Sequence, residues 1–149
     1  MSMKIKSIDR GWRKLGKTVK KTRPRYVDVG VMEKHDARSD AVTNTMLAMV
    51  HEFGLGVPER SFIRDLIDEN RLIYIKFIKK LAEQEVLGRI DRMTTLNLLG
   101  AKVEADMKGR VRDHIPPPNV DATVARKGSS TPLIDTGQLL SSIDYEVGP

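Results

Sequence analysis

Two long stretches with a helical repeat of apolar residues, 69–86 and 94–114, constrain the fold more than any other feature of the chain. In both, apolar side chains recur at spacings of three and four, which is typical of a helix with one buried face. These positions are Leu72, Ile75, Ile78, Leu81 and Ala82 in the first stretch, and Leu96, Leu99, Val103, Met107 and Val111 in the second. Gly88 follows the first stretch and the sequence IPPP follows the second, and such residues end helices. We therefore expect two long helices, from about Glu69 to Val86 and from about Thr94 to His114, that form most of one layer.

Two short segments alternate between apolar and polar or small residues, as half-buried strands do. The first is VDVGV, which begins at Val27, and the second is IDYEV, which begins at Ile143. We expect one strand near residues 26–31 and another near residues 143–147.

A shorter helix is predicted from about Asp40 to Phe53, with Ser39 as its N-cap. Its apolar face is predicted to consist of Val42, Met46, Met49, Val50 and Phe53. Gly54 is suited to the left-handed conformation that ends many helices, with Leu55 folded back on Val50. The sequence VPERSFIRDL that follows is predicted to be a short extended segment, and a helical turn fits it nearly as well.

The adjacent pair His51 and Glu52 raises the question of a zinc hydrolase. Such a site needs a second imidazole four residues after the first, so that both hold one metal while the glutamate acts as base. Here that position is Leu55, the other histidines, His35 and His114, are distant in sequence, and the chain has no cysteine. No phosphate loop, dinucleotide fingerprint or nucleophile with its base is found either. We therefore expect no metal ligand, no catalytic residue and no cofactor.

The segment at about 116–133 is rich in Pro, Gly and Ser, and a loop of that length in a small domain is more often functional or ordered by a partner than idle. After it, Asp135 and Gln138 are spaced as a capping box, while Ile134 and Leu139 are spaced as a hydrophobic staple. A short helix with Asp135 as its N-cap is therefore predicted before the last strand.

The charge of the chain is concentrated at its start. Residues 1–25 contain ten Lys or Arg residues and one acidic residue, a net charge of +9, and the other 124 residues hold 16 basic and 19 acidic groups, a net charge of −3. The apolar positions Ile5, Ile8, Trp12, Leu15 and Val19 predict an amphipathic helix over residues 1–24, and its other faces carry basic residues that include Arg13, Lys14, Lys17, Lys20 and Lys21. Such an arm suits an acidic protein surface or a phosphate backbone, and a solvated tail is the alternative.

The remainder, residues 25–149, is long enough for a single domain whose core needs no disulfide. The lack of cysteine fits a reducing cytoplasm. No apolar run approaches the ~18 residues of a membrane span, and the basic start lacks the unbroken apolar core of a signal peptide. We expect a soluble protein that is used inside a cell and has no contact with membranes.

Two segments, HEFGLGVPERSFIR and PPPNVDATVARKGSSTPLIDTGQLLSSIDYEV, occur together, with a strand before the first and two helices between them. This arrangement, over about residues 26–149, resembles the neck or tail-completion proteins of tailed bacteriophages, also called head–tail joining or virion morphogenesis proteins. The sequence PLIDTGQL is the most specific part of the resemblance, and the basic arm lies outside it. The implied fold is α+β, with a small antiparallel sheet that joins the strands near Val27 and Tyr145 and is covered by helices.

The resemblance implies a structural virion protein and no enzyme: a subunit that assembles into a ring around the DNA passage at the head–tail junction. The implied partners are copies of itself, the neighbouring connector and tail proteins, and packaged DNA as a candidate contact. The implied location is the neck or tail of the virion, after assembly in the host cytoplasm. The motif residues, which the resemblance makes structural, are His51, Glu52, Phe53, Gly54, Pro58, Arg60, Phe62, Pro132, Leu133, Asp135, Thr136, Gly137 and Leu139.

Two other functions compete with this one. The stronger is a nucleic-acid-binding protein that uses the basic arm, and the weaker is a hydrolase at His51. Two features count against the nucleic-acid-binding function. The arm has one aromatic residue, Trp12. The long helices carry acidic and basic residues in similar number, so no broad phosphate-binding surface extends beyond the arm. The dependence on salt concentration distinguishes a head–tail joining protein from a nucleic-acid-binding protein. Binding to phosphate groups weakens steeply as the salt concentration rises, whereas assembly through apolar contacts does not.

Overall fold

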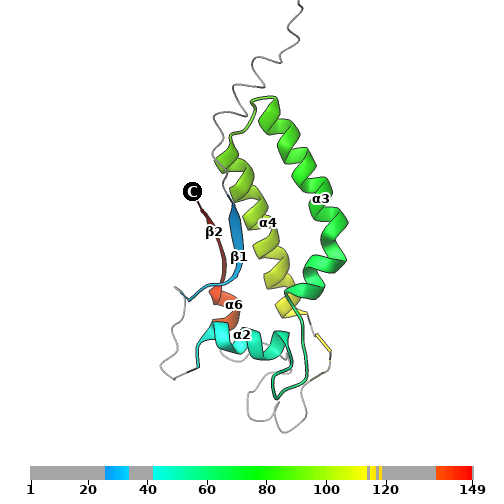
Figure 1. Cartoon of the computed structure of the whole chain (residues 1–149), viewed down its shortest axis with the longest axis vertical. Helices are drawn as coiled ribbons and strands as arrows, with labels where there is room; N and C mark the ends of the chain where they lie inside the picture. The colour runs from blue at the N-terminus through cyan, green and yellow to red at the C-terminus, as the bar shows by residue number, and fades with distance from the viewer. Residues whose placement is uncertain (1–25, 34–41, 114, 117, 119–136, 149) are drawn as a thin grey trace, which may run out of the picture.

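The structure is a computed structural model, and it describes residues 26–33, 42–113, 115, 116, 118 and 137–148. The predicted arm and most of the predicted loop at 116–133 lie outside these residues. The elements in chain order are β1 (Val27–Val31), α2 (Asn44–Glu52), α3 (Arg64–Val86), α4 (Arg92–Arg112), α6 (Gln138–Ser142) and β2 (Ile143–Val147). The fold is α+β, as predicted. Figure 1 shows α3 and α4 side by side along the molecule, the two strands beside α4, and α2 across one end next to α6.

The two predicted strands pair with each other in an antiparallel sheet, as the resemblance implied. The register places Val27 opposite Val147 and Val31 opposite Ile143, so the apolar positions of both strands lie on the same face. Helix α4 packs against both strands. The sheet is therefore covered on its apolar face by the second long helix.

Gly100 lets α4 approach the sheet closely. A Cβ at this position would lie 2.4 Å from Cδ2 of Tyr145 and 2.9 Å from Cγ2 of Val27. One turn earlier on α4, Asn97 accepts a hydrogen bond through Oδ1 from the hydroxyl of Tyr145, with a distance of 3.3 Å. The predicted apolar face of α4 is confirmed, because Leu96, Val103, Met107 and Val111 are buried and Leu99 is half-buried.

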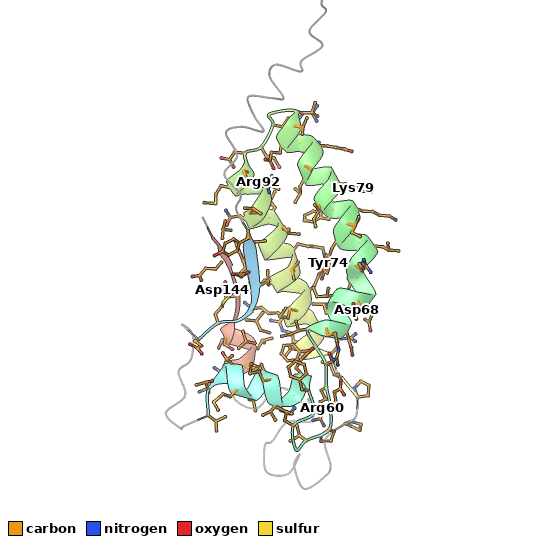
Figure 2. The ribbon with its side chains drawn as sticks, in the orientation of Figure 1. Arg60, Asp68, Tyr74, Lys79, Arg92 and Asp144 are labelled. Carbon is orange, nitrogen blue, oxygen red and sulfur yellow. The ribbon has the colours of Figure 1, made fainter. Side chains whose placement is uncertain are left out.

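Helices α3 and α4 are joined by polar contacts as well as by packing. The hydroxyl of Tyr74 donates to Oδ2 of Asp106 at 3.0 Å, and Lys102 donates to Oδ1 of the same carboxylate at 2.7 Å. Figure 2 shows Tyr74 between the two helices. Burial, reinforced by the hydrogen bond and the negative charge of Asp106, raises the pKa of Tyr74. The tyrosine therefore stays a neutral donor in this pair.

Helices α3 and α2 begin at positions other than those predicted. Helix α3 starts at Arg64, before the predicted Glu69. Helix α2 starts at Asn44, because the side chain of Thr43 accepts a hydrogen bond from the amide of Met46 at 3.1 Å and so acts as the N-cap. The predicted cap, Ser39, lies outside the described residues.

The predicted capping box at Asp135 is wrong, because the helix begins later than a helix with Asp135 as its N-cap would. Helix α6 begins at Gln138, and its N-cap is Gly137, which has a φ of 77° and gives no side-chain cap. Gln138 is thus the first helical residue, whereas a box capped by Asp135 needs it as the third. Asp135 and Ile134 themselves lie outside the described residues.

The predicted apolar face of α3 is mostly wrong. Leu81 is buried as predicted, but Leu72 is 71% exposed, and Ile75, Ile78 and Ala82 are exposed too. The buried positions are instead Leu66, Tyr74 and Leu81. The reason is that, among the described elements, α3 packs mainly against α4, so much of its apolar surface is left uncovered.

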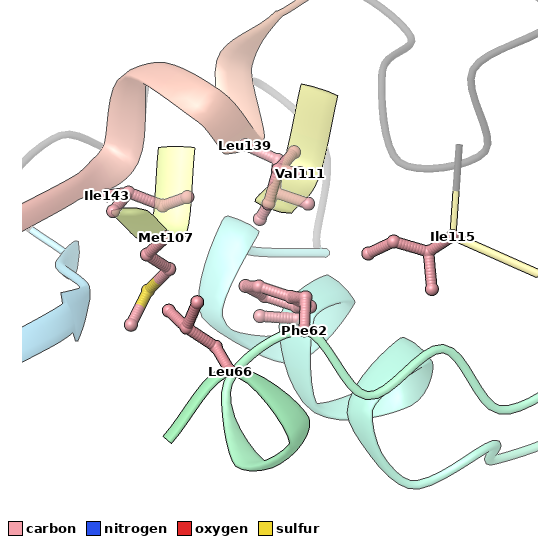
Figure 3. Packing of buried hydrophobic residues seen from close by; sticks show 8 residues of the cluster. Phe62, Leu66, Met107, Val111, Ile115, Leu139 and Ile143 are labelled. Carbon is pink, nitrogen blue, oxygen red and sulfur yellow. The ribbon is translucent and has the colours of Figure 1, made fainter. Parts of the chain in front are cut away.

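The core lies at the end of the molecule where α2 and α6 meet the ends of the long helices (Figure 3). Its buried members are Ala48, Phe62, Leu66, Met107, Val111, Ile115, Leu139 and Ile143. Phe62 and Ile143 are completely buried. The two segments that carry the phage resemblance therefore contribute to one core, Phe62 from the first and Leu139 and Ile143 from the second.

Candidate functional site

Glu52, the last residue of α2, organises the loop that leads into α3. Its carboxylate accepts four hydrogen bonds: from the hydroxyl of Ser61 at 2.7 Å, and from the amides of Phe62, Ile63 and Arg64 at 3.0, 3.0 and 2.9 Å. The N-cap residue of α3, Ile63, provides no cap of its own. Glu52 therefore supplies the acceptor that the first amides of α3 need, from a helix that precedes α3 in the chain. A negative charge at the start of a helix also interacts favourably with its dipole.

The backbone between Glu52 and Ser61 makes a tight return. Gly54 has a φ of 64°, and the amide of Leu55 donates to the carbonyl of Val50 at 2.9 Å. This is the hydrogen bond of a Schellman motif, so the predicted left-handed Gly54 is confirmed. The amide of Arg60 donates to the carbonyl of His51 at 2.8 Å. The predicted extended segment VPERSFIRDL is wrong at its end, since α3 begins at Arg64. Residues 58–63 form neither strand nor helix, and the hydroxyl or amides of the last three donate to the Glu52 carboxylate.

Gly54 and Gly56 give a matched test of this turn. Both have a positive φ, but a Cβ on Gly54 would lie 3.0 Å from Cβ of Glu59, whereas a Cβ on Gly56 would meet nothing within 4 Å. We expect Gly54→Ala to lower the free energy of unfolding by about 2 kcal/mol and Gly56→Ala by about 1 kcal/mol, because only the first adds crowding to backbone strain. Urea denaturation of both variants measures the difference, and equal losses would contradict it.

Two opposing effects act on the pKa of Glu52. Burial alone would raise it, but the hydrogen bonds from the Ile63 amide, the Ser61 hydroxyl and the amides of Arg64 and Phe62 together lower the pKa of Glu52 below its ordinary value of 4.5. The carboxylate is thus stabilised in its charged form. Both of its oxygens are occupied by these donors, so the side chain is engaged in structure and is not directed at a substrate.

The lowered pKa of Glu52 makes the stability of the loop depend on pH. A carboxylate whose pKa is lower in the folded state contributes stability above its unfolded pKa, and this contribution is lost as the pH falls through the folded value. We expect the difference in unfolding free energy between wild type and Glu52→Gln to shrink as the pH is lowered from about 6 to about 3. Chemical denaturation at a series of pH values measures this difference, and a constant gap would count against the charged form of Glu52.

Apolar side chains project from α2 and its C-terminal turn into solvent. We call the set formed by Val42, Met46, Met49, Phe53 and Leu55 the α2 surface. Met49 is 53% exposed, Phe53 is 58% exposed and Leu55 is 60% exposed. This corrects the sequence interpretation, in which Val42, Met46, Met49, Val50 and Phe53 were the buried face. The buried positions of α2 are Asn44, Ala48, His51 and Glu52 instead, and Val50 is half-buried.

A pocket opens beside the α2 surface. It has a volume of about 340 Å³, and its lining residues are Val31, Thr45, Ala48, Met49, Glu52, Phe53, Ile63 and Arg64. The elements that form it are the end of β1, α2 and the start of α3, so the loop held by Glu52 shapes one wall. A concave apolar site next to exposed apolar side chains is suited to binding a bulky apolar group.

The other motif residues occupy structural positions where the structure describes them. Phe62 and Leu139 belong to the core. Arg60 is buried, and its Nη2 donates to the carbonyl of Pro118 at 3.5 Å, while Pro58 is exposed. Pro132, Leu133, Asp135, Thr136 and all predicted residues of the arm lie outside the described residues.

His51 is buried near the end of α2 and its carbonyl holds the loop, as described above. Within the part of the chain that the structure describes, no group of three or more His, Asp or Glu side chains is arranged to hold a metal ion. In the same residues, no helix is both long enough and apolar enough to cross a membrane.

The sequence interpretation did not find the pocket or the exposure of the α2 surface. One signal was present: Asn44, Ala48 and His51 also recur at spacings of four and three, so α2 has two candidate faces. The more apolar face was assigned to the core. In the structure the face with the small Ala48 is buried, because the loop and α6 pack closely there.

Comparison of the chain with protein-family models, with curated proteins and with solved structures gives no match.

Proposed function

We propose that the protein is a structural subunit of a tailed-phage virion, which assembles with copies of itself into a ring at the head–tail junction. The observation that carries the self-assembly is the amount of exposed apolar surface. Large apolar side chains are exposed along α2, along the outer side of α3 and near the turn between α3 and α4. A monomer seldom leaves contiguous apolar patches uncovered, and such patches mark interaction sites.

The arrangement of these patches supports a ring rather than a simple dimer. The α2 surface and the exposed stripe of α3 lie on different helices, and α2 crosses the end of the molecule whereas α3 runs along its length (Figure 1). Contacts between two different patches join copies head to tail, and a head-to-tail contact closes into a ring when the rotation between copies permits it. The head–tail junction as the location rests on the resemblance of the HEFG and PLIDTGQL segments.

A nucleic-acid-binding function is the second candidate, and the observation that favours it is the net charge of +9 in residues 1–25. In the described part of the chain, Lys102, Lys108, Arg64, Arg92 and Arg110 are engaged with carboxylates on the same subunit. Arg71, Lys76, Lys79 and Lys80 are exposed on α3. A phosphate-binding surface would therefore include the arm and these residues of α3.

Negative-stain electron microscopy and sedimentation of the full-length protein test the proposal. We expect closed rings of uniform diameter that persist at about 0.5 M salt, because apolar contacts are insensitive to salt. A monomer that binds DNA at about 50 mM salt and releases it at about 200 mM salt would instead support the nucleic-acid function. A monomer at all protein concentrations would contradict the ring.

A further inference from the structure

The α2 surface has a particular charge as well as an apolar character. Residues 42–59 contain no Lys and no Arg, and their carboxylates are Glu52 and Glu59. At the end of β1, beside the pocket residue Val31, the exposed Glu33 adds a further carboxylate. Glu52 is buried and held by its four hydrogen bonds, and Glu59 is paired with Arg64. The other cation next to the pocket, Arg60, is buried. The surface therefore suits a partner that is apolar on one side and basic on the others.

Residues 1–24 of the same chain have that chemistry. Their apolar positions recur at spacings of three and four, and the first 25 residues carry ten basic groups and one acidic group. The largest apolar side chain among them is Trp12, the only tryptophan of the protein. Tryptophan is enriched among the residues that dominate the binding energy of interfaces, where it fills a pocket on the partner.

The pocket is lined mainly by apolar side chains, which are those of Val31, Ala48, Met49, Phe53 and Ile63. The flat, largely apolar ring system of an indole suits such a lining.

We propose that the α2 surface binds the basic N-terminal arm of a second copy of this chain, with Trp12 in the pocket beside Met49 and Phe53. This inference rests on the proposed function in one respect, that copies of the chain associate. It adds which surface receives which segment, and it makes the contact head to tail, because the arm and the α2 surface are different parts of the molecule.

β1 separates the start of the arm from the pocket of the same copy. β1 runs toward the pocket, since its last residue, Val31, is part of the lining. Tyr26 lies at the other end of the sheet, where its carbonyl accepts from the amide of Gly148 at 3.0 Å. Five residues of strand place this end roughly 17 Å from Val31. The arm therefore joins the domain at the end away from its own pocket, and the variant with two cysteines described below distinguishes binding to the same copy from binding to a second copy.

Cysteine crosslinking of the full-length protein tests the contact without background, because the natural chain has no cysteine. One preparation carries Arg13→Cys and an affinity tag, and the other carries Leu55→Cys, at the edge of the α2 surface. After mixing and treatment with a thiol-specific crosslinker, we expect a tagged–untagged dimer as the main product. The matched control is Leu72→Cys, which is exposed and apolar but lies on α3 outside the pocket, and it should give at least about tenfold less crosslinked product.

Second substitutions identify the binding groups. Adding Phe53→Lys to the Leu55→Cys chain, or Trp12→Ala to the Arg13→Cys chain, should reduce the crosslinked dimer about tenfold or more. Trp12→Phe, which keeps a ring but loses the N–H group, should reduce it less. Circular dichroism confirms that each variant is folded. Undiminished crosslinking in folded Phe53→Lys and Trp12→Ala proteins would overturn the proposal.

Two further outcomes separate this inference from the proposed ring. A chain that carries both Arg13→Cys and Leu55→Cys, and gives only crosslinks within one chain at every concentration, would overturn binding to a second copy. Rings that form normally when Trp12 and Phe53 are replaced would overturn the docking of the arm and leave the ring standing. Crosslinks between copies without rings would support the docking and contradict the ring.

Discussion

Replacing Glu52 by alanine is expected to lower the free energy of unfolding by about 3 kcal/mol, measured by urea denaturation near neutral pH. The carboxylate is the acceptor for the Ser61 hydroxyl and for the amides of Phe62, Ile63 and Arg64. Removing it leaves these donors without that acceptor, and hydrogen bonds to a charged group contribute more than neutral ones. Phe62, which is completely buried, sits within the released segment, so the loss reaches the core.

Glu59→Ala is the matched control for the Glu52 variant. Glu59 belongs to the same loop and pairs with Arg64, but the side chains of both partners are at least half exposed. An exposed ion pair contributes little, so this variant should lose no more than about 0.5 kcal/mol. Glu52→Gln should fall between the two, because an amide keeps one acceptor oxygen and loses the charge. Equal losses for Glu52→Ala and Glu59→Ala would show that the four hydrogen bonds do not hold the loop.

The elements of this fold follow from local patterns in the sequence. The predictions were close to the observed bounds for the strands Val27–Val31 and Ile143–Val147 and for the helix α4. The spacing of apolar residues and the residues that end helices are both local signals in the sequence. The start of α3 was placed too late. The sequence SFIR that leads into it contains no N-cap residue adjacent to Arg64, because the acceptor comes from Glu52, distant in sequence.

Which face of a helix is buried was much harder to predict for α2 and α3. The prediction from the amphipathic pattern assumes that the more apolar face of a helix packs against the core. This assumption holds only where all of a protein's apolar surface is covered within one subunit. Met49 and Phe53 are exposed on α2 while Ala48 and His51 are buried. The apolar residues left outside are the observation on which the proposed self-assembly of the protein rests.

The role of Glu52 was not predicted from its neighbourhood in the sequence. The pair with His51 drew attention to metal chemistry, whereas the groups that define Glu52 are Ser61 and the amides that follow it. A carboxylate that caps a later helix has no fixed spacing, because the length of the intervening loop varies. The left-handed Gly54, in contrast, was predicted correctly, since the Schellman motif is local.

Gly100→Ala is expected to destabilise the protein by about 2 kcal/mol, although alanine is the better helix former. A Cβ at Gly100 would lie 2.4 Å from Cδ2 and 2.6 Å from Cγ of Tyr145, atoms close to the backbone of β2 that cannot move without shifting the ring. Gly109→Ala, on the same helix, is the control: nothing lies within 4 Å of its Cβ position, so we expect a gain of up to about 1 kcal/mol. Thermal unfolding of the two variants measures these opposite signs. A gain in both would mean that α4 is free to move away from the sheet, and that the contact of Gly100 with Tyr145 does not fix the distance between them.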